Sequence, residues 1–138
     1  MHPGSLQVNR LPTRLLVLVL VILAAIAIAG CGASSPAAVQ TVDAGKAVGM
    51  LDSRAVIDVR TPAEYAAGHI AGAQNIDVEA ADFAANISTL DKEAPYLLYC
   101  RSGRRSAIAA EEMAKAGFTD VVDGGGMADL VAAGAPTE

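Results

Sequence analysis

One short segment carries the residues best suited to nucleophilic chemistry. Cys100 ends an apolar, β-type run and opens a loop made of Arg101, Ser102, Gly103, Arg104 and Arg105. A free cysteine titrates near pH ~8.5, and its thiolate is the nucleophilic form. Neighbouring cations, a helix N-terminus and inward-pointing backbone N–H groups all favour the thiolate. The loop therefore predicts that Cys100 is a reactive nucleophile, largely ionised near neutral pH.

The size of these effects supports that prediction. Two or three hydrogen bonds to a charged group, at about 1.5 kcal/mol each, lower a pKa by roughly two units or more at 1.36 kcal/mol per unit. The alternative is a buried cysteine that acts as a small hydrophobe. Arginine and glycine crowd the five positions after Cys100, which disfavours that alternative.

The N-terminal segment has the layout of a bacterial lipoprotein signal. A polar start with Arg10 and Arg14 precedes an unbroken apolar run over residues 15–29, and small residues lead into Cys31. We predict that residues 1–30 are a signal peptide and that Cys31 carries a lipid, which places the protein outside the cytoplasm, anchored to the bacterial membrane. An uncleaved anchor helix is the alternative, although about fifteen apolar residues fall short of the roughly 20 that span a bilayer.

The charge balance restricts the partners. The formal net charge is −5, and without Arg10 and Arg14 eight basic residues face fifteen acidic ones, which gives −7. An acidic domain is a poor candidate for binding nucleic acid. Three of the eight basic residues lie in the Cys100 loop, so this loop should attract small anions.

With Cys31 lipidated, Cys100 has no disulfide partner within the chain. We expect no cofactor. We also expect no metal site, because a lone His69 after Gly68 has no second ligand of its kind beside it.

After a flexible spacer over residues 31–40, strand and helix signals alternate through a domain at residues 41–138. Strands are predicted at 39–41, 55–59, 75–76, 96–99 and 120–122, and helices at 43–51, 61–68, 79–87, 104–116 and 127–133, with a Gly124–Gly126 turn. This order predicts an α/β fold, a doubly wound parallel sheet of about four to five strands flanked by helices. In such sheets ligands bind beyond the carboxyl ends of the strands, where Cys100 lies.

Several stretches, taken in order, resemble the rhodanese domain. They are Ile57-Asp58-Val59-Arg60, Glu64-Tyr65, residues 68–76, Tyr99 to Ser106, Gly117-Phe118 and Gly124 to Gly126. The resemblance implies a sulfurtransferase that moves a sulfur atom from thiosulfate or a similar donor to a thiophilic acceptor through a Cys100 persulfide. The acceptor would be cyanide, a thiol or a protein. The alternative is a sulfur-carrier or partner-binding module with little thiosulfate activity.

The resemblance also implies roles for individual residues. Backbone N–H groups from Arg101 to Arg105 would surround the persulfide, and Arg101 would attract the anionic donor. Asp58 would support the loop by pairing with Arg105 or Arg104, and Arg60 would also be structural. Related phosphatases have a Cys-x5-Arg loop, whereas here the fifth residue after Cys100 is already Arg105, so the loop is one residue short for phosphate.

Two positions depart from the family pattern. Ala71 stands where single-domain rhodaneses usually carry proline, and the chain has no tryptophan near Met127 or anywhere else. Both changes concern packing beside the loop, so they bear on substrate shape and stability more than on persulfide formation.

Overall fold

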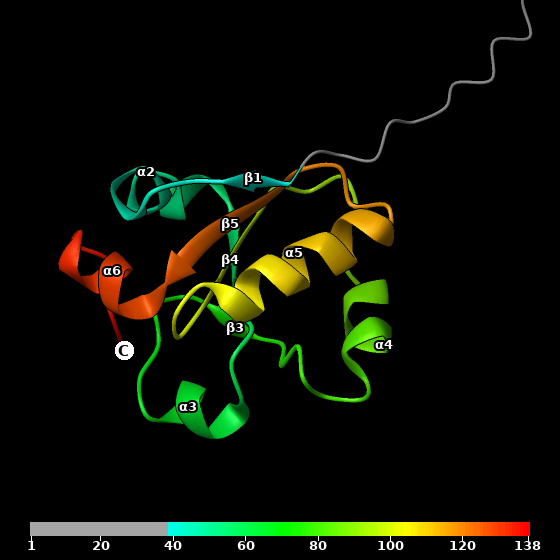
Figure 1. Ribbon diagram of the computed structural model, residues 1–138, viewed down its shortest axis with the longest axis horizontal. Helices are drawn as coiled ribbons and strands as arrows, with labels where there is room; N and C mark the ends of the chain where they lie inside the picture. Colours follow the sequence, from blue (N-terminus) through cyan, green and yellow to red (C-terminus); the bar gives the residue numbers. More distant parts are fainter. Residues whose placement is uncertain (1–38) are drawn as a thin grey trace, which may run out of the picture. The chain divides into compact units, whose positions relative to one another are not determined.

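The computed structural model describes residues 39–138, which form a parallel sheet covered on both faces by helices (Figure 1). The five strands lie in the order β1-β5-β4-β2-β3, and every pairing is parallel. The strands are β1 (Gln40–Thr41), β2 (Ala55–Asp58), β3 (Gln74–Asn75), β4 (Tyr96–Cys100) and β5 (Val121–Gly126). The predicted doubly wound α/β fold is therefore confirmed.

Helices occupy most of the connections between strands. They are α2 (Ala44–Val48), the short 3-10 helix η2 (Leu51–Ser53), α3 (Pro62–Ala66), α4 (Phe83–Ser88), α5 (Arg104–Lys115) and α6 (Met127–Ala132). No helix in residues 39–138 is both long and apolar enough to cross a membrane. The predicted signal peptide and most of the predicted spacer lie outside the described residues.

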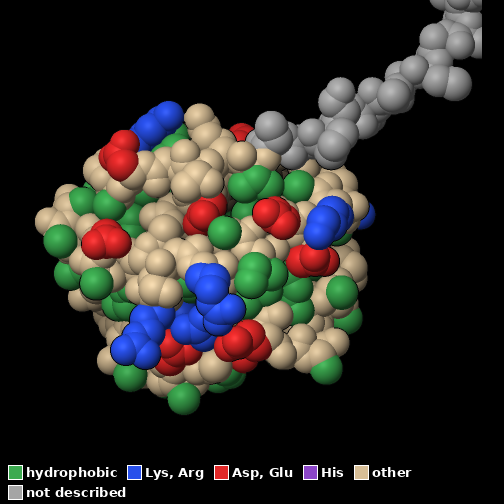
Figure 2. Space-filling view, viewed as in Figure 1, with side chains coloured by type: hydrophobic (Ala, Val, Ile, Leu, Met, Phe, Trp, Pro, Cys, Tyr) green, Lys and Arg blue, Asp and Glu red, His purple; other side chains and the backbone are tan. Residues whose placement is uncertain are grey.

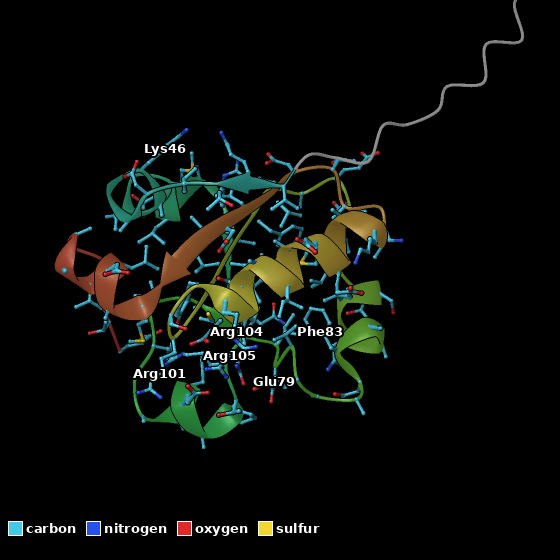
Figure 3. All side chains as sticks on the ribbon, viewed as in Figure 1. Lys46, Glu79, Phe83, Arg101, Arg104 and Arg105 are labelled. Atoms are coloured by element: carbon cyan, nitrogen blue, oxygen red, sulfur yellow. The ribbon has the colours of Figure 1, made fainter. Side chains whose placement is uncertain are left out.

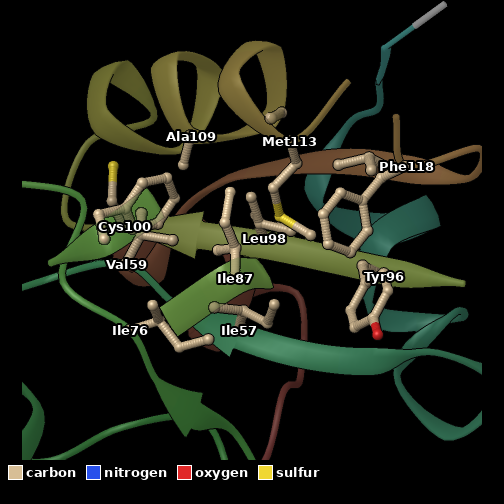
Figure 4. Packing of buried hydrophobic residues seen from close by; sticks show 13 residues of the cluster. Ile57, Val59, Ile76, Ile87, Tyr96, Leu98, Cys100, Ala109, Met113 and Phe118 are labelled. Atoms are coloured by element: carbon tan, nitrogen blue, oxygen red, sulfur yellow. The ribbon is translucent and has the colours of Figure 1, made fainter. Parts of the chain in front are cut away.

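Strand β4 is the centre of the fold, and all five of its residues are buried. Because side chains alternate along a strand, Leu98 and Cys100 contribute to one hydrophobic cluster, together with Met113 of α5 (Figure 4). Phe83 of α4 belongs to the same cluster. Leu97 and Tyr99 point to the opposite cluster, which includes Ala47 of α2 and Leu130 of α6. The core therefore fixes Cys100 between the sheet and α5.

Two helix starts position the polar groups near Cys100. At α3, the Thr61 hydroxyl accepts a hydrogen bond from the Glu64 backbone, and the Glu64 carboxylate accepts one from the Thr61 backbone, which is the capping box that the sequence indicates. At α5, Gly103 precedes the helix with φ +90°, a conformation that glycine adopts without strain. Gly103 therefore lets the chain turn sharply from the Cys100 loop into the helix.

The predicted turn at Gly124–Gly126 is wrong, because these residues continue strand β5. A side chain at Gly126 would place its Cβ 3.0 Å from the Arg101 carbonyl oxygen, and one at Gly124 would lie 3.0 Å from Leu97 Cδ2. The glycines therefore give β5 room to pass close to β4 and to the Cys100 loop.

Two predicted helices begin or end differently. Residues 79–82 are turns before α4, where the Asp77 carboxylate accepts a hydrogen bond from the Glu79 backbone. The helix predicted at residues 43–51 ends at Val48, and Gly49 caps it. Local side-chain and glycine effects of this kind move helix ends by a few residues.

Candidate functional site

Cys100 lies at the carboxyl edge of the sheet, at the end of β4 and beside the end of β2. It is fully buried, whereas Arg101, Ser102 and Arg104 of the following loop are exposed. The sequence indicates an exposed loop, and that is confirmed, but the cysteine lies beneath the loop and not on its surface. An apolar cluster contacts Cys100 on one side and the loop backbone encloses it on the other.

The loop backbone points hydrogen-bond donors at the sulfur. The Gly103 N–H donates to Cys100 Sγ with an N···S distance of 3.0 Å. Burial raises the pKa of the Cys100 thiol, but hydrogen bonds from the Ser106 backbone and hydroxyl and from the Ser102 and Gly103 backbones outweigh it, so that the pKa lies below its usual value. Of the donors predicted from Arg101 to Arg105, the structure shows those of Ser102 and Gly103, and Ser106 adds donors from outside that range. Together they favour the thiolate.

Ser106 belongs to this site, although the sequence analysis gave it no role beyond its place in the stretch from Tyr99 to Ser106. Its side chain is fully buried, and its hydroxyl lies 3.0 Å from the Gly103 carbonyl oxygen. The available signal was its place in the first turn of α5, where backbone and side-chain donors converge on the strand end. Ser106 therefore links the start of the helix to the loop and to the sulfur.

Arg105 joins the Cys100 loop to α3. Its Nη1 and Nη2 atoms each lie 2.8 Å from an oxygen of Glu64, and Nη1 lies 3.4 Å from the Glu79 carboxylate. The hydrogen bonds from Arg105 lower the pKa of Glu64 to about 2. The predicted pairing of Asp58 with Arg105 or Arg104 is therefore wrong. The sequence did not identify Glu64 as this partner, because it lies 41 positions before Arg105.

Asp58 instead pairs with Arg60. The Arg60 Nη2 and Nε atoms lie 2.6 and 3.0 Å from Asp58 Oδ2, and the Tyr99 hydroxyl donates to the same oxygen at 2.7 Å. Tyr99 also accepts from the Ile70 N–H, and Arg60 donates to the Gly68 carbonyl. Burial and the Asp58 carboxylate raise the pKa of Tyr99. This buried network supports the segment at residues 68–70 and makes no direct hydrogen bond to the Cys100 loop.

Arg101 and Arg104 have no carboxylate partner among the described residues. They lie with Arg105 near the start of α5, on the side facing α3 (Figure 3). In the space-filling view, basic side chains gather at this end of the domain, with acidic ones beside them (Figure 2). Two unpaired guanidinium groups beside a buried cysteine suit a small anion.

A pocket of about 430 Å³ opens next to the loop. It is lined by Arg60, Arg101, Met127, Ala128 and Val131. Within residues 39–138, no group of three or more histidine, cysteine, aspartate or glutamate side chains is placed to hold a metal ion. The site consists of a cysteine, its N–H donors, two unpaired arginines and this pocket.

His69 stacks on Tyr65, with ring centroids 3.7 Å apart, and its Nε2 lies 3.4 Å from a Glu138 carboxylate oxygen. Its Nδ1 lies 3.1 Å from the Tyr65 carbonyl oxygen. These contacts give His69 a structural role between α3 and the C-terminal residue.

Comparisons with known proteins agree with this geometry. The family model of the rhodanese-like domain matches residues 40–130. The chain is 45% identical over 73 residues to thiosulfate sulfurtransferase GlpE of Pseudomonas fluorescens, covering 51% of this chain and 64% of that protein. It is 35% identical over 74 residues to thiosulfate sulfurtransferase PspE of Escherichia coli, covering 54% and 71%. The chain thus spans just under two thirds of the GlpE protein.

Solved structures give the same result. The rhodanese-like domain of the Alr3790 protein from Anabaena matches with a TM-score of 0.63 and 29% identity, covering 75% of this chain and 79% of that one. A rhodanese-related protein from Thermoplasma volcanium matches with a TM-score of 0.64 and 27% identity, covering 72% and 97%. The sheet, the Cys100 loop and these matches together show that the chain belongs to the rhodanese-like domain family.

Proposed function

We propose that this protein is a sulfurtransferase that carries sulfur on Cys100. The observation that carries the proposal is the 3.0 Å hydrogen bond from the Gly103 N–H to Cys100 Sγ, within a loop whose other donors also lower the thiol pKa. Such a loop stabilises a thiolate before the reaction and a persulfide anion after it. The names of the GlpE and PspE relatives support thiosulfate as a donor.

The reaction has two steps. In the first, the Cys100 thiolate attacks the outer sulfur of thiosulfate, a new S–S bond forms, and sulfite leaves with the electron pair of the broken S–S bond. In the second, an acceptor such as cyanide or a thiolate attacks the outer sulfur of the persulfide and restores the Cys100 thiolate. Each step exchanges one bond for another, so no cofactor is required.

The surrounding residues have distinct parts in this proposal. Arg101 and Arg104 attract the anionic donor, because neither charge is neutralised by a described carboxylate. Arg105 is held by Glu64 and therefore positions the loop, while Asp58 and Arg60 support the neighbouring segment. Because Cys100 is fully buried, the exposed loop must shift for the donor sulfur to reach it.

Replacing the nucleophile tests the proposal. Cys100→Ser should abolish cyanide-dependent thiocyanate release from thiosulfate, because a hydroxyl cannot form a persulfide. Circular dichroism should show an unchanged fold, since the size change is small. Thiocyanate release above background in the variant would show that another group carries the sulfur.

A sulfur-carrier or partner-binding role is the second candidate. The burial of Cys100 favours it, because a buried thiol in a resting loop exchanges slowly with a small free donor. A partner protein that moves the loop on binding would then supply or accept the sulfur. Slow thiosulfate turnover together with a stable persulfide on the isolated protein would distinguish this role from that of a rapid enzyme.

We also propose that a lipid on Cys31 anchors the protein outside the cytoplasm. The proposal rests on the sequence pattern around Cys31 and on the apolar run before it. Cys31→Ala should leave an unprocessed precursor or move the protein to the soluble fraction. Unchanged lipid labelling in that variant would exclude the lipid anchor.

A further inference from the structure

Arg105 differs in position from the other two arginines of the Cys100 loop. It lies in the first turn of α5, directly before Ser106, whose backbone and hydroxyl donors favour the Cys100 thiolate. A guanidinium carries a planar fork of N–H donors that binds two oxygens of a carboxylate, a phosphate or a sulfate. An arginine at this position therefore has the chemistry to hold an oxyanion beside the cysteine.

The carboxylate of Glu64 occupies this fork. Nη1 and Nη2 of Arg105 each lie 2.8 Å from one of the two Glu64 oxygens. The backbone N–H and the hydroxyl of Thr61 donate to Glu64 Oε2 at 3.2 and 3.0 Å, which orients the carboxylate. An anion from solution must displace this intramolecular partner before it can bind the same fork.

The Glu64–Arg105 pair is sheltered from water and stays charged. The Arg105 side chain is 14% exposed and the Glu64 side chain 29%. The hydrogen bonds from Arg105 lower the pKa of Glu64 to about 2, so this carboxylate is ionised at neutral pH. The Glu64 carboxylate, with smaller effects of Glu79 and of the Cys100 thiolate, raises the pKa of Arg105. The charge of Arg105 is thus balanced within the protein.

The other two arginines of the loop are not held in this way. Arg101 and Arg104 are exposed and have no carboxylate partner among residues 39–138. Exposed cations attract anions of every kind weakly, because water and salt screen their charge. Only the sheltered cation, Arg105, would select for an oxyanion, and Glu64 determines whether it is available.

We propose that Glu64 is a specificity-determining residue that acts through Arg105 and keeps inorganic oxyanions, such as phosphate and sulfate, from binding at the Cys100 loop. By neutralising Arg105, it leaves N–H and hydroxyl donors as the main groups that face the sulfur. These donors suit a single sulfur atom, whereas a tetrahedral oxyanion gains most from a cation beside them. The inference rests on the proposed sulfurtransferase function for its kinetic test alone.

Inhibition of thiosulfate turnover by inorganic phosphate, at constant ionic strength, tests this proposal on the full chain. Glu64→Gln keeps the side-chain size and removes the charge, so the inhibition constant for phosphate should fall about fivefold. Glu79→Gln is the matched control, because Glu79 makes one 3.4 Å contact with Arg105 and is 56% exposed. Its inhibition constant should change by less than about twofold.

A double variant identifies the group that gains the anion. Adding Arg105→Ala to Glu64→Gln should return the inhibition constant for phosphate at least to the native value, because Arg105 supplies the charge. A merely structural effect of Glu64 would not be reversed in this way. An unchanged constant in Glu64→Gln, or an equal fall in the double variant, would overturn the inference.

Binding to protein that cannot turn over separates this inference from the proposed function. Inorganic phosphate should shift the ¹⁵N-amide signals of Ser102, Gly103 and Arg105 more in Cys100→Ser/Glu64→Gln than in Cys100→Ser at the same concentration. Equal shifts in the two proteins would overturn the role of Glu64 even if the native chain transfers sulfur. Larger shifts in the double variant, without any persulfide on the native chain, would retain that role and refute the proposed transfer.

Discussion

Strands β2 and β4 are parallel neighbours that end at the same edge of the sheet. Their last residues nevertheless differ in how their charge is balanced. Asp58 ends β2 and accepts hydrogen bonds from Arg60 and Tyr99, so its charge is neutralised. Cys100 ends β4, where N–H donors converge on the sulfur while Arg101 remains unpaired. The comparison shows how one edge provides a rigid support on one strand and a reactive group on the next.

Removing the support should have the largest effect on stability. Arg60→Ala leaves the fully buried Asp58 carboxylate without its cation and should lower the free energy of unfolding by about 3–5 kcal/mol, measured by urea denaturation. Arg54→Ala is the control, because its partner Asp120 is half exposed and surface pairs contribute about 1 kcal/mol or less. Equal losses of unfolding free energy in the two variants would show that the burial of the Asp58–Arg60 pair does not increase its contribution to stability.

Glu64 joins α3 to the Cys100 loop through Arg105, so loss of its charge should have an intermediate effect on stability. Glu64→Gln should reduce the free energy of unfolding by about 1 kcal/mol at neutral pH, because the pair with Arg105 is partly exposed. The folded pKa is about 2, against 4.5 for a free glutamate, so this stabilisation is present above pH 4.5 and is lost as the pH falls toward 2.

Unfolding measured from pH 6 to pH 2 should therefore show a smaller acid-induced loss in Glu64→Gln than in the native chain. Glu112→Gln, which breaks an exposed pair with Lys115, should leave the acid dependence unchanged. Identical acid curves for the native chain and Glu64→Gln would contradict the role given to Glu64.

The variant Ser106→Ala tests whether donors from α5 stabilise the Cys100 thiolate. The Ser106 donors favour the Cys100 thiolate, so their partial loss should raise the pKa of the Cys100 thiol. The midpoint of persulfide formation against pH should move upward, and the rate should fall at pH values below that midpoint. Ser88→Ala is a matched control, because its hydroxyl also bonds a helix carbonyl three residues earlier but lies on α4. No shift in Ser106→Ala would exclude the hydroxyl as a thiolate donor.

Arg101→Ala should have the smallest effect. An exposed charge about 4 Å from an anion is worth about 1 kcal/mol in water, so use of thiosulfate should fall roughly fivefold. Use of an uncharged polysulfide donor should fall less, and added salt should shrink the difference between donors. Equal losses for charged and uncharged donors would show that Arg101 shapes the loop and does not act by charge.

The alternation of strands and helices was predictable, because apolar runs and the capping box at Thr61 are local signals. The same reasoning placed Cys100 at the carboxyl edge of the sheet. The strand at Gly124–Gly126 was not predictable, since its conformation depends on close packing against the Cys100 loop. The Glu64–Arg105 pair joins residues 41 positions apart, and no local pattern selects one carboxylate over another.

The most direct test of the central claim is the mass of the intact protein after incubation with thiosulfate and removal of small molecules. The account predicts a gain of one sulfur atom per chain, located on the peptide that contains Cys100, absent from Cys100→Ser and removed by cyanide with release of thiocyanate. An unmodified Cys100, or a sulfur atom that persists in Cys100→Ser, would contradict the assignment of Cys100 as the sulfur carrier.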